Sequence, residues 1–213
     1  MQPSDAQPVP SGVQTSDVES VLEFWFGALD AHGRADAEHT RRWYTKDAEF
    51  DRELGRRFGA LHASVLAFEH EAWLSTTRGR LAYVIVLDQF SRNLFRGDAR
   101  SFGGDERALA AALEGVVQGV DAALALDERM FLYMPFMHSE LLEHQRRSLE
   151  LFTNLCEGQP EEVRSYVANG VDYAKRHLLI IERFSRFPHR NAMLGRASTP
   201  EEVEFLKEPG SSF

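Results

Sequence analysis

Residues 80–93 read RLAYVIVLDQFSRN, and this stretch decides the fold class of the chain. Its apolar run, Leu81–Leu87, has the composition of a β-strand. The apolar positions nevertheless continue through Phe90 and Leu94 at helical spacing, which favours a helix over a strand. Because the segment is apolar on all sides at its start, we predict that it forms a central helix.

Proline usage supports further helices on both sides of this segment. Residues 11–134 contain no proline, and proline breaks the interior of a helix. Helical periodicity over such a stretch predicts an all-α fold of about eight or nine helices with essentially no sheet. We expect one domain over residues 15–213 after a flexible tail at residues 1–14. The predicted helices cover approximately residues 16–26, 47–69, 80–93, 105–119, 127–135, 136–157 and 161–186, with a last one starting after residue 199.

Local signals predict where several helices begin and end. The sequence SDVE that starts at Ser16 is typical of a capping box, and Gly27 is placed to end the same helix in a left-handed conformation. Pro135 is expected to end a short helix, and Gly170 is a possible weak point in a later one. Thr199–Glu202 combines an N-cap threonine, a proline and a glutamate, which predicts a helix start.

The composition excludes several classes of protein. The chain has 213 residues, 43% of them hydrophobic, which is ordinary for a globular protein. Its net charge of −9 argues against sequence-independent binding of nucleic acid. The single cysteine excludes a disulfide framework and a cysteine-rich zinc site, and we expect neither a metal nor a cofactor. No apolar run approaches the roughly 20 residues that span a bilayer. Residues 1–14 lack the basic start of a secretory signal, so we expect a cytoplasmic protein without a membrane partner.

Two segments of the chain match each other. Residues 84–92, VIVLDQFSR, align with residues 178–186, LLIIERFSR, and the alignment continues to Arg96 and Arg190. The shared pattern is four aliphatic residues, an acid, any residue and Phe-Ser-Arg, followed after three residues by arginine.

The match has two interpretations. In a helix, an acid and an arginine four residues apart share a face, which predicts the ion pairs Asp88–Arg92 and Glu182–Arg186. In this interpretation the two segments are buried helices that pack in the same way, and each pairs the charges at its own end. The alternative is that two similar helix ends project arginines toward one site.

A basic segment within this acidic chain is the observation behind the second interpretation. Residues 176–196 carry five arginines, one acid and two histidines, and Pro188 places the polar residues after it at a helix terminus. Arginine suits carboxylate or phosphate oxygens, and asparagine or histidine adds neutral contacts. The candidate ligand-binding residues are Arg92, Asn93, Arg96, His138, Ser139, Arg186, His189, Arg190 and Asn191. An internal network with Asp88 and Glu182 remains open as the alternative.

Four stretches together resemble one known family. They are VLEFWFG (residues 21–27), LDQFSRNLFRG (residues 87–97), ERMFLYMPFMHSELLEHQ (residues 128–145) and ERFSRFPHRNAMLGRASTPEEVEFL (residues 182–206). The chain resembles the DUF924 family of bacterial proteins of unknown function. The resemblance implies antiparallel helix pairs stacked in a right-handed array similar to tetratricopeptide repeats, and it implies no activity. The chain departs from the family at Ser91, where proline is common, which leaves the helix end there less firmly defined.

The sequence therefore leaves two functions open. A stack of helix pairs forms a concave surface, which favours a module that binds a protein or peptide. The alternative is a binder or enzyme for a small anionic metabolite, which would use the Arg/His/Asn cluster at helix ends. The sequence does not identify a reaction or a catalytic residue.

Overall fold

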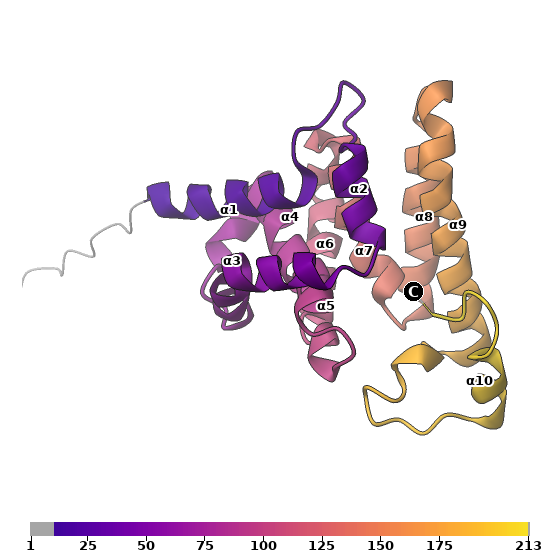
Figure 1. Cartoon of the computed structure of the whole chain (residues 1–213). Helices are drawn as coiled ribbons and strands as arrows, with labels where there is room; N and C mark the ends of the chain where they lie inside the picture. The colour runs from indigo at the N-terminus through magenta and orange to yellow at the C-terminus, as the bar shows by residue number, and fades with distance from the viewer. Residues whose placement is uncertain (1–10, 213) are drawn as a thin grey trace, which may run out of the picture.

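The computed structural model describes residues 11–212, and this part of the chain contains helices and no strand (Figure 1), as predicted. The α-helices are α1 (Ser11–Phe26), α2 (Ala37–Tyr44), α3 (Ala48–Leu66), α4 (Thr77–Val84), α5 (Ser91–Leu94), α6 (Asp105–Val117), α7 (Leu126–His138), α8 (Leu142–Glu157), α9 (Glu161–Phe184) and α10 (Pro200–Phe205). The π-helical segment η2 (Ile85–Phe90) joins α4 directly to α5, so the described residues form nine separate α-helices. A regular tetratricopeptide-like array stays a prediction.

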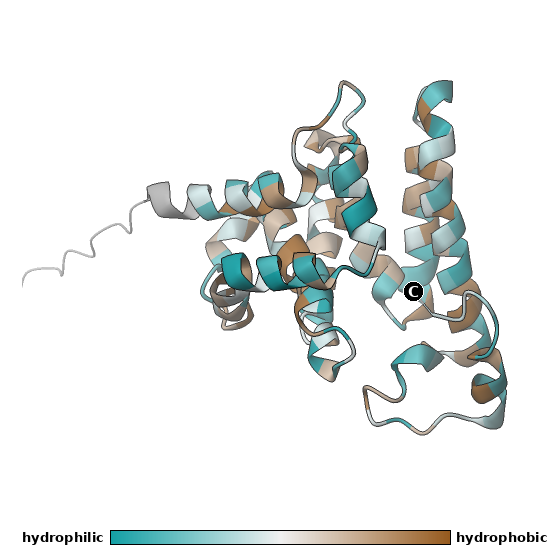
Figure 2. Cartoon of the chain, viewed as in Figure 1, coloured by the Kyte–Doolittle hydropathy of each residue, from teal (hydrophilic) through white to brown (hydrophobic). Residues whose placement is uncertain are grey.

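The continuous helix α4–η2–α5 is the centre of the main core, which confirms the helix predicted over residues 80–93. The apolar side chains of Leu81–Leu87 are at most 2% exposed, and helices α1, α3, α6 and α7 pack around them. Burying each large aliphatic side chain stabilises the fold by about 1.5–3 kcal/mol. The outward face of α3 is largely hydrophilic (Figure 2), as expected of an amphipathic helix over the core.

Ser91 continues this central helix and does not end it. Its hydroxyl lies 2.8 Å from Nε2 of His62, and its side chain is fully buried. Unlike proline, serine keeps its backbone N–H, so the helix extends to Leu94.

The predicted start of the first helix is wrong. Helix α1 begins at Ser11, so Ser16 lies inside it and is not the N-cap. Residues 11–16 include no proline to interrupt the helix, and the SDVE pattern does not require a start at that point. Of the flexible tail predicted at residues 1–14, residues 11–14 belong to α1, and residues 1–10 lie outside the described residues. Gly27 has φ +62°, which confirms the left-handed end of the helix.

The predicted helix end at Pro135 is also wrong. Helix α7 passes through Pro135 and ends at His138, one turn later. The amide of Gln145 donates hydrogen bonds of 2.6 Å to the backbone carbonyls of Met137 and Ser139, which stabilises the chain at this end. The proline therefore costs one backbone hydrogen bond near a terminus that a side chain caps.

Helices α8 and α9 form a long hairpin, and Gly170 lies inside it without weakening α9 (Figure 1). A Cβ atom at Gly170 would lie 2.8 Å from the ring of Phe152 in α8. The glycine therefore permits close helix packing and is not a break.

The C-terminal segment folds back from the end of α9 to the main body. Ser185 has φ +57° and reverses the chain, and η5 (Pro188–Arg190) follows. Phe187 and Phe205 of α10 pack with the last turns of α9 in a small second core. Thr199 and Glu202 form the predicted capping box of α10. Among the described residues, no helix has the length and apolar character needed to cross a bilayer.

Candidate functional site

Five charged or titratable residues from distant parts of the chain meet where the C-terminal segment contacts the main body. Asp88 lies in η2, Arg92 in α5, Asp105 at the start of α6, His138 at the end of α7, and Arg190 in η5. We call these five residues the polar centre. π-helical segments such as η2 occur frequently at functional sites.

Asp88 is fully buried and organises one side of the polar centre. Its Oδ1 accepts a hydrogen bond from Nδ1 of His138 at 2.7 Å and forms an ion pair with Arg92 at 2.9 Å, and its Oδ2 accepts a hydrogen bond from Gln89 at 2.6 Å. Burial by itself would raise the pKa of Asp88. The positive charge of Arg92 and the contact with His138 outweigh burial and hold that pKa well below its usual range, so Asp88 is a carboxylate.

Arg92 joins Asp88 to Asp105. Its two terminal nitrogens donate to the Asp105 carboxylate at 2.9 and 3.1 Å, and one of them also donates to the backbone carbonyl of Asp88 at 2.7 Å. Burial would lower the pKa of Arg92, but the two carboxylates raise it. The predicted ion pair between Asp88 and Arg92 is therefore present.

Arg190 is buried in the polar centre but is poorly neutralised. Its side chain is 9% exposed, and its one hydrogen bond to a carboxylate is a long contact of 3.5 Å with Asp105. Within residues 11–212 its buried Nε has no hydrogen-bond partner. The guanidinium lies over the rings of Phe102 and Phe187, 4.7 and 4.5 Å from their centroids. Burial, and then the charge of Arg92, lowers the pKa of Arg190 to about 10.

Three histidines lie around the two arginines, and their environment favours the neutral form. Burial is the largest cause for each, and nearby arginines add to it. The pKa of His138 is lowered although Asp88 opposes the shift. The pKa falls to about 3 for His177 and to about 4 for His189. Burial and the nearby arginines therefore favour the uncharged form of all three rings.

The structure places Arg96 and Asn93 away from the polar centre. Both bind Asp51 of α3: Arg96 donates to its two oxygens at 2.9 and 3.0 Å, and Asn93 donates at 2.7 Å. Ser139 lies 2.9 Å from Nδ1 of His144 and accepts a hydrogen bond from the backbone of Leu141 in the turn before α8.

Arg186 does not pair with Glu182 as the sequence pattern predicts. The left-handed conformation of Ser185 ends the helix before Arg186, so the two side chains no longer share a helix face. Glu182 is exposed, and Arg186 instead donates to both oxygens of Glu202 at 2.6 and 2.7 Å. Asn191 belongs to the same group, because its amide donates to Glu202 at 3.3 Å.

Of the candidate ligand residues, Arg92, His138 and Arg190 are therefore brought together, with His189 beside Arg190. Asp105, which bridges the two arginines, is not among the residues predicted from the sequence. Its position at the start of an alanine-rich helix is typical of an acid that interacts with the helix dipole, and no local pattern marks the long-range contacts.

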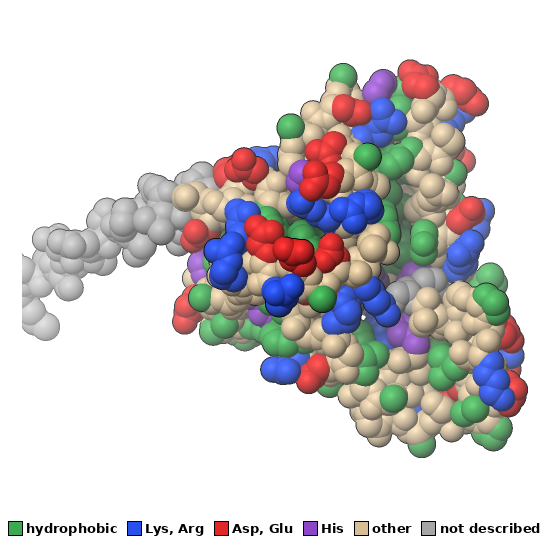
Figure 3. Space-filling view, viewed as in Figure 1, with side chains coloured by type: hydrophobic (Ala, Val, Ile, Leu, Met, Phe, Trp, Pro, Cys, Tyr) green, Lys and Arg blue, Asp and Glu red, His purple; other side chains and the backbone are tan. Residues whose placement is uncertain are grey.

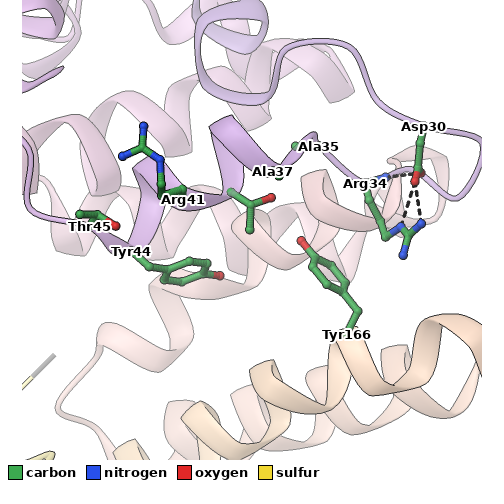
Figure 4. A pocket seen from close by; sticks show the side chains of 9 residues that line it. Asp30, Arg34, Ala35, Ala37, Arg41, Tyr44, Thr45 and Tyr166 are labelled. Carbon is green, nitrogen blue, oxygen red and sulfur yellow. Dashed lines mark hydrogen bonds and ion pairs between the residues drawn. The ribbon is translucent and has the colours of Figure 1, made fainter.

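Two hollows of the surface lie elsewhere. The larger, about 520 Å³, opens between α2 and α9 and is lined by Tyr44, Tyr166 and neighbouring residues (Figure 4). The smaller, about 320 Å³, involves α1 and Arg78. Neither hollow includes a residue of the polar centre. In Figure 3, basic and histidine side chains meet at the notch between the main body and the C-terminal segment.

Comparisons with known proteins place the chain in a family. The sequence profile of DUF924, described as a bacterial protein of unknown function, matches residues 21–210. The solved structure of ATU0120 from Agrobacterium tumefaciens, also a protein of unknown function, is similar with a TM-score of 0.78 and 34% sequence identity. The similarity covers 91% of this chain and 98% of that chain. A search of curated proteins finds no match. The chain therefore belongs to the DUF924 family.

Proposed function

We propose that the polar centre binds a small anionic molecule through Arg190. The observation that supports this function best is the buried guanidinium, which has one long contact to a carboxylate and an Nε without a partner in the described residues. A buried cation is costly unless it is paired and hydrogen-bonded. A carboxylate or phosphate would supply both the missing charge and the missing acceptors.

The charges of the polar centre support an external anion. Asp88 is used by Arg92 and His138, and Asp105 is used in a two-pronged contact by Arg92. The two carboxylates therefore have little negative charge and few acceptor positions left to offer Arg190. The pKa of Arg190 is lowered to about 10. A bound anion would oppose that shift by favouring the charged guanidinium, so binding gains from relieving an unfavourable state of the free protein.

The experiment is a thermal unfolding series with phosphate, acetate and glycolate as probes. A probe at about 100 times its Kd is expected to stabilise the protein by about 2.7 kcal/mol. Arg190→Gln should abolish the shift, and Arg190→Lys should weaken it because lysine lacks the planar fork.

Arg96→Gln is the matched control. Arg96 occupies the aligned position in the first segment but binds Asp51, so the variant should keep the full ligand shift. If no probe stabilises the protein, or if Arg190→Gln responds like the parent protein, the proposed function is wrong.

The hollow between α2 and α9 supports a second candidate, a site for a protein or peptide. Tyr44 and Tyr173 are 58% and 41% exposed, and their rings stack with centroids 6.4 Å apart beside the hollow. Exposed aromatic groups are enriched at protein interfaces. Binding to a fluorescent peptide library should be lost in Tyr44→Ala and kept in Arg190→Gln; equal binding by the parent and Tyr44→Ala would reject this candidate.

A further inference from the structure

We infer that the site selects anions that carry a hydroxyl group next to the charged group, because His138 presents an acceptor nitrogen to the molecule that Arg190 holds. A 2-hydroxy acid and a singly protonated phosphate have this chemistry. The inference rests on the proposed function, since it names the class of anion for the same site.

The contact with Asp88 fixes which nitrogen of His138 carries the proton. Nδ1 of His138 lies 2.7 Å from Oδ1 of Asp88, and this oxygen belongs to a carboxylate that Arg92 also contacts at 2.9 Å. A carboxylate only accepts hydrogen bonds, so Nδ1 is the donor. In a neutral ring the other nitrogen, Nε2, is then an acceptor with a lone pair.

The acceptor nitrogen of His138 is available to a ligand. The side chain is 16% exposed, whereas Asp88 beneath it is 1% exposed. Among the described residues, the hydrogen bond seen for the ring is the one that Nδ1 makes with Asp88, and Nε2 makes none. Burial and the charge of Arg92 also oppose a second proton on the ring.

Two separate series of side-chain contacts connect His138 to Arg190. On one side, His138 binds Asp88, Arg92 joins Asp88 to Asp105, and Asp105 contacts Arg190. The carboxylates of that side are engaged by protein donors.

A second series of contacts, through aromatic rings, also connects His138 to Arg190. The ring of His138 lies 6.3 Å from that of His177, which lies 5.5 Å from the ring of Phe187. The guanidinium of Arg190 lies 4.5 Å from the centroid of Phe187. Each step is one side-chain contact, and from this we infer that Arg190 and Nε2 of His138 both reach a single small molecule.

This arrangement sorts anions by their hydrogen-bond donors. The charged oxygens of a ligand take the donors of Arg190, and an adjacent hydroxyl donates to Nε2 of His138. An anion without a hydroxyl leaves Nε2 facing another acceptor or nothing, and an unmade hydrogen bond in a buried site is costly. The expected discrimination is about tenfold or more in Kd.

Matched pairs of anions test the inference by isothermal titration calorimetry. Glycolate should bind about tenfold tighter than acetate, which differs by one hydroxyl. Phosphate should bind tighter than sulfate at a pH where phosphate is mainly the singly protonated dianion, since sulfate then has the same charge but no proton to donate. If both members of each pair bind equally, the inference is wrong while the proposed function stands. If none of the four anions binds, both are wrong.

Variants of His138 assign the selectivity to this side chain. His138→Phe keeps a ring but removes the acceptor, so glycolate should lose its advantage while acetate still binds. His138→Gln supplies an amide oxygen in case the phenylalanine variant fails to fold, and it should keep part of the preference. His39→Phe is the matched control: His39 also contacts an aspartate, Asp36 at 3.0 Å, but lies in α2. A His39 variant that loses the selectivity, or a folded His138→Phe that keeps it, would overturn the inference.

Discussion

Acid is expected to destabilise this protein through His177, and the size of the effect follows from its surroundings. The ring is 4% exposed, and burial lowers its pKa from 6.5 to about 3, against the opposing contact with the Tyr173 carbonyl. The neighbouring ionisable groups His138, Arg190 and His189 also lower this pKa. Below pH 6.5 the unfolded chain therefore binds a proton that the folded protein excludes, so stability falls as the pH falls.

The magnitude at about pH 5 is about 2 kcal/mol. That pH lies about 1.5 units below 6.5, and each unit is worth about 1.4 kcal/mol while only the unfolded state is protonated. The loss begins near pH 6.5 and continues until the folded pKa, about 3, is reached. His189, with a pKa lowered to about 4, adds to the loss in the same direction.

The assay is urea unfolding of the parent protein and His177→Gln at about pH 8 and about pH 5. The variant has its own packing cost at both pH values, and the comparison uses only the difference between them. The parent should lose about 2 kcal/mol more than the variant between the two conditions. His32→Gln, which changes an exposed histidine, is the control and should follow the parent. Equal losses in the parent and His177→Gln would refute the reasoning.

Three further changes test the packing and the ion pairs. Gly170→Ala places a Cβ atom 2.8 Å from Phe152 and should destabilise the protein by about 1–3 kcal/mol in urea unfolding; an unchanged midpoint would contradict the close packing of α8 and α9. Asp105→Asn removes the charge that both arginines of the polar centre contact, and it should lower the free energy of unfolding in urea by about 3–5 kcal/mol. A variant as stable as the parent protein would contradict the bridging role of Asp105. Thr199→Ala removes the N-cap of α10 and should lower the free energy of unfolding by about 1 kcal/mol, and no change would indicate that the cap contributes nothing.

The fold class could be predicted from the sequence because helical periodicity is a local property. The central helix over residues 80–93, the left-handed Gly27 and the capping box at Thr199 all depend on neighbouring residues, and the structure confirms them. Pro135 misled the prediction because its cost is offset by Gln145, a residue of the next helix. Local signals cannot report compensation that comes from a distant side chain.

The candidate site was predictable only in part for the same reason. The pair Asp88–Arg92 follows from helical spacing, and the structure contains it. The matching pair at Glu182 fails because one left-handed residue, Ser185, ends the helix before the arginine. Asp105 was missed because its partners Arg92 and Arg190 lie 13 and 85 residues away along the chain, beyond the reach of a local pattern.

The polar centre combines the two interpretations of the arginine-rich segments, an internal network of ion pairs and a site for a ligand. A structural network accounts for Asp88, Arg92 and Asp105, because their charges and hydrogen bonds satisfy one another. It does not account for Arg190, whose buried Nε has no partner among the described residues and whose contact with a carboxylate is long. Nor does it account for Nε2 of His138, since the hydrogen bond seen for that ring within the described residues is made by Nδ1. The paired network is rigid, and it holds the guanidinium of Arg190 and Nε2 of His138 in fixed positions. A small-molecule site needs preorganised groups of this kind. The stabilising network is therefore what makes selective anion binding possible, and losing Asp105 should impair both stability and binding, whereas losing Arg190 should impair binding alone.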